Sequence, residues 1–157
     1  TRYPERVISL TVEAPGEFRP GAVPPNELPP EDFVRAFRSH PERPPAMAPP
    51  DPAFMARVWP TVERLMGDGT PNADFLARLS QVRTRTLVLF GRDDGIIPPE
   101  NGRLYRQAMP NCALIYVYDA AHDIQSDRPE AFADVVADFV RRGMNFLVND
   151  DDQLINP

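Results

Sequence analysis

Two continuous apolar runs most limit the folds open to this chain. Residues 86–90 (TLVLF) and 113–118 (ALIYVY) do not alternate between polar and apolar side chains. Such runs are typical of strands buried on both faces of a parallel sheet. Helical patterns at 99–109 and 128–142 follow the first and second runs. The order strand, helix, strand, helix predicts an α/β fold with parallel strands and a right-handed crossover.

The region before these runs is rich in proline. Of the 20 prolines in the 157-residue chain, 13 lie between Pro15 and Pro60. A β-branched run at 7–12 predicts one strand, and helical patterns lie near 30–37, 51–67 and 72–79. Proline predicts a bend or stop in the second helix near Trp59–Pro60.

This proline-rich region could be a disordered linker or an ordered insertion. Disordered segments are poor in large apolar side chains, yet this one contains several: Phe33, Phe37, Phe54, Met55, Trp59 and Met66. We therefore expect an irregular helical insertion that packs on another part of the protein.

Composition excludes several classes of function. The chain carries 17 basic and 23 acidic side chains, a net charge of −6, so we expect no nucleic-acid partner. The lone Cys112 excludes an internal disulfide and a multi-cysteine zinc site. No apolar run reaches the ~20 residues of a membrane span, and the start lacks a secretory signal pattern. We expect a cytoplasmic protein that does not bind membranes.

Candidate chemistry follows the two buried strands. Asp93 and Asp94 come after the first run, and Asp119 and His122 come after the second. Neighbouring strands lie about 4.8 Å apart, and ligands of open parallel sheets bind at the carboxyl ends of the strands. A carboxylate facing a histidine there would form the orienting half of a nucleophile–base–acid relay. Taken singly, Asp93 is more simply a turn residue and His122 a surface residue.

Longer motifs resemble the last third of an α/β-hydrolase-fold protein. They are Gly91–Pro98 (GRDDGIIP), Met109–Asn111 (MPN), Ala120–His122 (AAH) and Asp127–Phe132 (DRPEAF). The resemblance implies a catalytic acid at Asp94, the fourth residue of a Gly-x-x-Asp pattern, and a catalytic base at His122. Ala121 stands where that family usually has glycine, which would cost energy only at a positive φ.

The resemblance also implies a domain layout. Residues 1–20 would hold a core strand, 21–80 a helical lid, 81–142 the core with the acid and base, and 143–157 a tail. The nucleophile is missing, because Ser9, Ser39, Ser80 and Ser126 all lie outside a Gly-x-Ser-x-Gly elbow. Since the chain begins with Thr1 in mid-pattern, we expect the N-terminal half of the same hydrolase as a partner, across a large apolar interface.

These expectations describe an esterase-like hydrolase of a small apolar substrate. Phe54, Trp59 and Ile96 are expected to bind the substrate, and no cofactor or metal is expected. The unseen nucleophile leaves epoxide hydrolase, dehalogenase and carbon–carbon hydrolase open. The alternatives are a non-catalytic, partner-binding relative, a free-standing binding module, Thr1 as an N-terminal nucleophile, and a metal held among the strand-end aspartates and His122.

Overall fold

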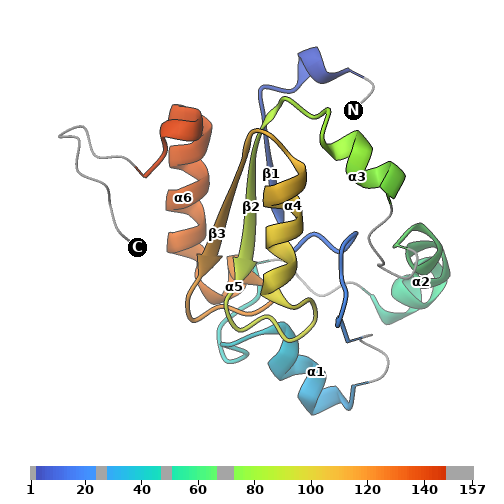
Figure 1. Ribbon diagram of the computed structural model, residues 1–157. Coiled ribbons are helices and arrows are strands. Elements are labelled where there is room, and N and C mark those ends of the chain that lie inside the picture. Colours follow the sequence, from blue (N-terminus) through green and yellow to red (C-terminus); the bar gives the residue numbers. More distant parts are fainter. Residues whose placement is uncertain (1–2, 24–27, 47–50, 67–72, 148–157) are drawn as a thin grey trace.

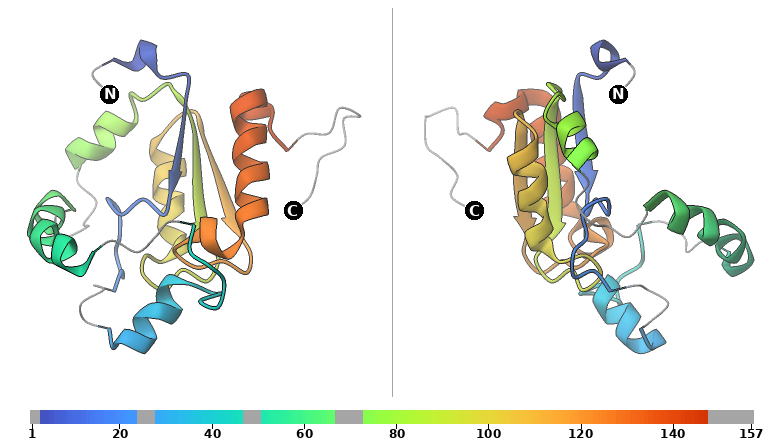
Figure 2. Two further views of the ribbon diagram at one scale, coloured as in Figure 1. Left: turned by 180° about the vertical axis from the view of Figure 1, so that it is seen from behind. Right: turned by 45° about the vertical axis from the view of Figure 1, so that its right-hand side comes forward.

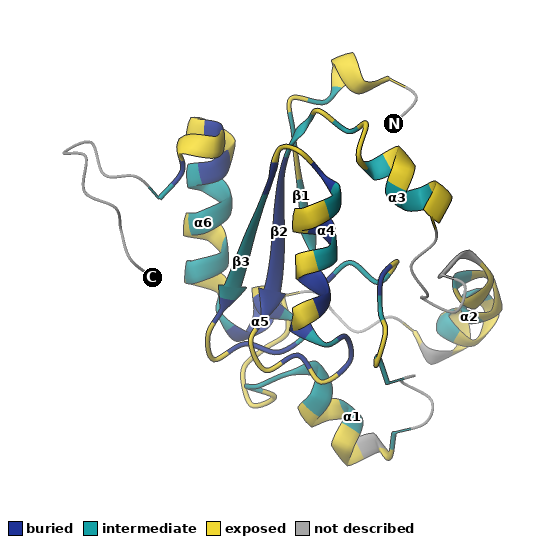
Figure 3. Cartoon of the chain, in the orientation of Figure 1, coloured by how far each residue is buried: buried dark blue, intermediate teal, exposed yellow. Residues whose placement is uncertain are grey.

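The core is a sheet of three parallel strands. The computed structural model describes residues 3–23, 28–46, 51–66 and 73–147 (Figure 1). Strands β1 (Ser9–Glu13), β2 (Arg85–Gly91) and β3 (Cys112–Val117) lie side by side in that order. In their register Val12 pairs with Val88, and Leu89 pairs with Ile115. The predicted parallel sheet is confirmed, with β2 at its centre and buried along almost its whole length (Figure 3).

Side chains of β2 point alternately into two apolar cores. On one face Val88 and Phe90 pack with Tyr105 of helix α4 (Gly102–Ala108), which follows the 3-10 turn η3 (Pro99–Asn101). On the other face Leu87 and Leu89 pack with Phe139 of helix α6 (Pro129–Arg142). Helices therefore cover both faces of the sheet, as continuous apolar strands require.

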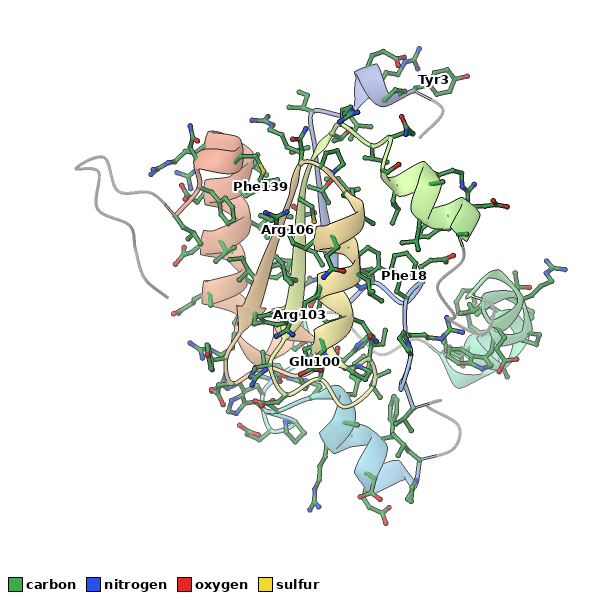
Figure 4. The ribbon with its side chains drawn as sticks, viewed as in Figure 1. Tyr3, Phe18, Glu100, Arg103, Arg106 and Phe139 are labelled. Carbon is green, nitrogen blue, oxygen red and sulfur yellow. The ribbon has the colours of Figure 1, made fainter. Side chains whose placement is uncertain are left out.

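Figure 2 shows α4 and α6 on opposite sides of the strands. In Figure 4, Phe139 is labelled on α6, and Arg103 and Arg106 are labelled on α4, where both arginines are exposed. Polar side chains thus lie on the outer surface of α4, and apolar ones face the sheet.

The proline-rich region forms helices, as predicted. They are α1 (Pro30–Phe37), α2 (Pro52–Met66) and α3 (Ala73–Leu79). Asp51 caps α2, because its Oδ1 accepts the N–H of Ala53 at 2.9 Å. The helix does not stop at Trp59–Pro60 but continues to Met66. Pro60 removes one backbone donor, and the flanking turns continue the helix around it.

Tyr105 ties the segment after β1 to α4. Its hydroxyl donates to the carbonyl of Pro15 at 3.0 Å and accepts the N–H of Phe18 at 3.1 Å. The Phe18 ring, fully buried, lies with its centroid 4.7 Å from that of Tyr105. The segment following β1 is therefore part of the core.

Two further segments differ from the sequence-based expectation. The loop before α6 contains a short helix, α5 (Ile124–Asp127). Residues 143–147, expected to begin a tail, pack back on α6 through the turn η4 (Gly143–Asn145). The Phe146 ring contacts Phe139, with centroids 5.4 Å apart. Burial of the apolar Phe146 ring explains why residues 143–147 pack against α6.

Thr1 and residues 148–157 of the expected tail lie outside the described residues, as do 24–27, 47–50 and 67–72. Among the described helices, none combines the length and apolar character needed to span a bilayer.

Candidate active site

Asp94 and His122 meet at the carboxyl ends of β2 and β3. The Oδ2 atom of Asp94 lies 3.0 Å from Nδ1 of His122, so the predicted contact is confirmed. The Asp94 side chain is completely buried, and its Oδ1 accepts the N–H groups of Ile96 and Ile97, each at 2.9 Å. Asp93 is exposed and stays apart from this pair. The Asp94 carboxylate thus has three hydrogen-bond partners: Ile96, Ile97 and His122.

This geometry assigns the ring nitrogens of His122. An ionised carboxylate only accepts hydrogen bonds, so the Asp94 carboxylate accepts a hydrogen bond from the Nδ1–H group. In the neutral ring Nε2 is then the acceptor. The His122 side chain is 23% exposed, and the Phe37 ring of α1 covers part of it with centroids 5.2 Å apart. The arrangement suits a histidine that takes a proton at Nε2.

The two strand-end loops approach closely at Gly91. A Cβ on Gly91 would lie 1.9 Å from the carbonyl oxygen of Ala121 and 2.4 Å from that of Ala120. The N–H of Asp93 donates to the Ala120 carbonyl at 2.9 Å, which joins the loops directly. The positive-φ residues other than glycine are Ala14, Asp119 and Leu147 in the part of the chain that is described. Alanine at position 121 therefore carries no left-handed strain.

Helix α1 ends between the two loops. The carbonyl of Ala36 accepts the N–H of Gly95 at 3.0 Å, and that of Phe37 accepts the N–H of Asp123 at 3.1 Å. One helix thus contacts both the acid loop and the histidine loop. The apolar pattern predicts Phe37 only as a packing residue, because helical spacing does not show which distant ring a side chain contacts.

Of the three expected substrate-binding residues, Ile96 lies next to the pair, through its N–H bond to Asp94. Ile96 follows the acid, but its side chain is 7% exposed and packs in the core with Phe90. Phe54 is 46% exposed, and its contact with substrate stays a prediction. Trp59 donates from Nε1 to Glu63 of its own helix at 2.7 Å. Figures 1 and 2 show α2 set apart from the strand ends.

Known proteins with similar sequences are hydrolases. The chain is 30% identical over 80 residues to a 2-hydroxy-6-oxononadienedioate/2-hydroxy-6-oxononatrienedioate hydrolase of Pseudomonas putida, a match that covers 51% of this chain and 28% of that protein. It is 31% identical over 77 residues to a pimeloyl-[acyl-carrier protein] methyl ester esterase of Neisseria meningitidis serogroup B, covering 49% of this chain and 30% of the esterase. No protein-family model matches the chain.

Solved structures share the fold over nearly all of the chain. A meta-cleavage product hydrolase from Pseudomonas fluorescens IP01 superposes with a TM-score of 0.68 at 14% identity, over 89% of this chain and 58% of that one. The naproxen esterase of Bacillus subtilis superposes with a TM-score of 0.61 at 19% identity, over 88% of this chain and 53% of that one.

The chain has an α/β-hydrolase fold. The predicted α/β-hydrolase fold is confirmed. The matches span less than a third of each curated relative and little more than half of each solved structure.

In this α/β-hydrolase fold a second histidine lies beside the His122 loop. His40 Nε2 is 2.9 Å from Asp119 Oδ1, and its Nδ1 is 3.1 Å from Glu42 Oε1. The Asp119 contact, followed by that of Glu42, raises the pKa of His40. The same contact is the main cause that lowers the pKa of Asp119. The fold thus pairs His40 with a residue 79 positions further along the chain.

Glu13 contacts the residues that follow His122 in its loop. Its Oε1 accepts the N–H of Ile124 at 2.9 Å, and its Oε2 accepts from Nε2 of Gln125 at 2.6 Å. Burial is the main cause that raises the pKa of this carboxyl. The end of β1 therefore also braces the loop that carries His122.

Other candidates stay outside the pair. Burial raises the pKa of the Cys112 thiol to about 11, so the thiol is protonated at neutral pH and suits a packing role. Within the described ranges, no group of three or more histidine, cysteine, aspartate or glutamate side chains is placed to hold a metal ion.

Proposed function

We propose that this chain supplies the acid–histidine pair of an α/β-hydrolase. The observation that carries the proposal is the contact between Asp94 and His122 at the ends of adjacent parallel strands. In this role Nε2 of His122 removes a proton from a nucleophile or water, and Asp94 stabilises the imidazolium that forms. His122 then returns the proton to the leaving group.

The nucleophile belongs to the N-terminal half of the hydrolase, present as a preceding segment or as a separate chain. Two observations support such a partner. Ile8, next to β1, is 78% exposed, and Leu10 within it is 36% exposed. Strand β1 is also an edge of the described sheet, and exposed apolar strand edges are normally covered in native proteins.

The substrate class of the proposal is a small molecule with an apolar part, cleaved at an ester or a carbon–carbon bond. The names of the relatives support both reactions, since one is a methyl ester esterase and another a 2-hydroxy-6-oxo-dienoate-type hydrolase. The Phe37 ring beside His122 would present an apolar surface to such a substrate. Residues 21–80 are proposed to act as the lid, with α1 as its part nearest the pair.

Substitution of the pair tests the proposal in the complete protein. Hydrolysis of p-nitrophenyl esters and of a 2-hydroxy-6-oxo-dienoate is measured for Asp94→Asn and His122→Ala. We expect each to lower kcat by roughly 10³- to 10⁴-fold, because the base loses its orienting partner or is removed.

Asp93→Asn is the matched control, since Asp93 precedes Asp94 but is exposed. It should leave kcat and the melting temperature unchanged. If turnover survives in His122→Ala, or if the two asparagine variants behave alike, the pair is not catalytic and the partner-binding alternative is favoured.

A further inference from the structure

A buried carboxylate outside the acid–histidine pair joins two distant segments of the chain. Asp127, in α5, is fully buried. Its Oδ2 accepts the N–H groups of Ala121 at 2.8 Å and Ser39 at 2.9 Å, and its Oδ1 accepts the N–H of His40 at 2.9 Å. Ser39 and His40 follow α1, whereas Ala121 immediately precedes His122.

The surroundings of Asp127 match what a buried charge needs. A carboxylate removed from water is costly unless donors surround it, and hydrogen bonds to an ionised group are about twice as strong as neutral ones. Arg38 adds a positive charge, with Nε 3.7 Å from Oδ1 of Asp127. Arg43 donates from Nη1 to the backbone carbonyl of Asp127. Several independent groups therefore converge on this one residue.

Sharing of a single oxygen couples the two segments. Because Oδ2 serves both Ser39 and Ala121, a shift of the chain after α1 is transmitted to the residue before His122. A second connection runs parallel to it, from Asp123 N–H to the Phe37 carbonyl at 3.1 Å. The Phe37 ring itself lies on His122. The end of α1 and the histidine loop thus form one hydrogen-bonded unit.

We propose that Asp127 is a positioning residue, which sets the place of the His122 imidazole and ties it to the segment 38–46 after α1. Its effect on rate rests on the proposed function, whereas its effect on the Asp94–His122 contact does not. Misplacement of a catalytic group by 1 Å can cost on the order of 100-fold in rate.

A purely structural role is the competing explanation, and the chain offers a matched control. Asp138 of α6 also accepts a backbone N–H, from Leu147 at 2.7 Å, and also lies near an arginine, Arg142, at 3.6 Å. None of its recorded partners belongs to the His122 loop. Asp138→Asn therefore removes the same chemistry as Asp127→Asn without touching that loop.

The experiment compares these two variants in the complete protein. Proton NMR follows the His122 Nδ1–H resonance, assigned by its loss in His122→Ala, and steady-state kinetics give kcat and KM. We expect Asp127→Asn to shift or broaden this resonance and to lower kcat 10- to 100-fold, with KM less affected. Asp138→Asn should lower stability alone.

An unchanged resonance in folded Asp127→Asn overturns the proposal. So does an unchanged kcat in an enzyme whose turnover needs His122. If His122→Ala itself leaves turnover intact, the proposed function fails, and the resonance alone decides the role of Asp127. Should Asp127→Asn not fold, Asp127→Glu gives the same comparison, because it keeps both acceptor oxygens and moves them by one methylene.

Discussion

Gly91 is where the acid strand and the histidine loop come closest. The residue ends β2, and the space for its Cβ is occupied by the backbone of Ala120 and Ala121. Carbonyl oxygens cannot rotate away as the end of a flexible side chain can. The Asp94–His122 contact therefore requires a residue without a side chain at position 91, three residues before Asp94.

Replacement of Gly91 tests that condition. We expect Gly91→Ala to lower the free energy of unfolding by about 1–3 kcal/mol, because the added methyl group must displace the histidine loop. Urea unfolding measures the loss, and the His122 Nδ1–H resonance should shift at the same time. A variant with unchanged stability and an unchanged resonance would show that the loops are free to separate.

Among the secondary-structure elements, α1 and the chain after it bear most directly on the site. Several side chains outside β2 and β3 connect the segment 38–46 to the loop 119–127. Ser126 Oγ accepts the N–H of Ala46 at 2.8 Å, and His40 lies between Asp119 and Glu42. The element that contacts His122 is thus fastened to the His122 loop by side chains.

The His40 contact predicts a pH-dependent contribution to stability. Its pKa in the folded protein is raised above the ordinary 6.5, chiefly by Asp119 and then by Glu42, while Arg43 opposes the shift. A raised pKa means that the folded state holds the proton more tightly. The contribution is therefore fully present below the unfolded pKa and is lost as pH rises through the folded pKa.

Thermal melts of the wild type and His40→Gln test this sign. The melting temperatures should differ more near pH 6 than near pH 9, because the contribution of His40 to stability decreases as pH rises. Arg128 also lies 3.6 Å from Asp119, so Arg128→Gln is a control that alters the same carboxylate without a titrating histidine. A gap between wild type and His40→Gln that is equal at both pH values would contradict the prediction.

At the scale of the whole molecule, the sheet is covered unevenly. Strand β2 is enclosed by both cores, whereas β1 and β3 form the two edges of the described sheet. Near β1 the apolar Tyr3, Ile8 and Leu10 are 58%, 78% and 36% exposed. Apolar surface of this kind favours association with a covering partner.

Residues 1–157 expressed alone should therefore self-associate. We expect a species larger than a monomer in light scattering, and a single folded complex when the proposed N-terminal half is produced with them. Ile8→Lys should reduce self-association of the isolated chain, because a charge beside an edge strand opposes pairing. If the unmodified chain were a monomer that melts cooperatively, the proposal of a covering partner would be contradicted.

Local patterns in the sequence were enough to predict the sheet and the acid–histidine contact. A strand buried on both faces is almost entirely apolar, so residues 86–90 and 113–118 are visible as nearly continuous apolar runs. Parallel strands bring their carboxyl ends to one edge. Asp94 and His122 thus had to lie near each other once the strands were neighbours. Resemblance to a family selected Asp94 over Asp93.

Only the tertiary structure decided what surrounds the pair. Asp127 accepts hydrogen bonds from Ser39 and His40 across 88 and 87 residues, and Phe37 reaches His122 from a helix far away in the chain. Local spacing marks Phe37 and Phe54 alike as apolar helix residues. Yet Phe37 packs at the site, and Phe54 is 46% exposed. Burial and carboxylate contacts depend on which distant segments meet, and that information is absent from any short stretch of sequence.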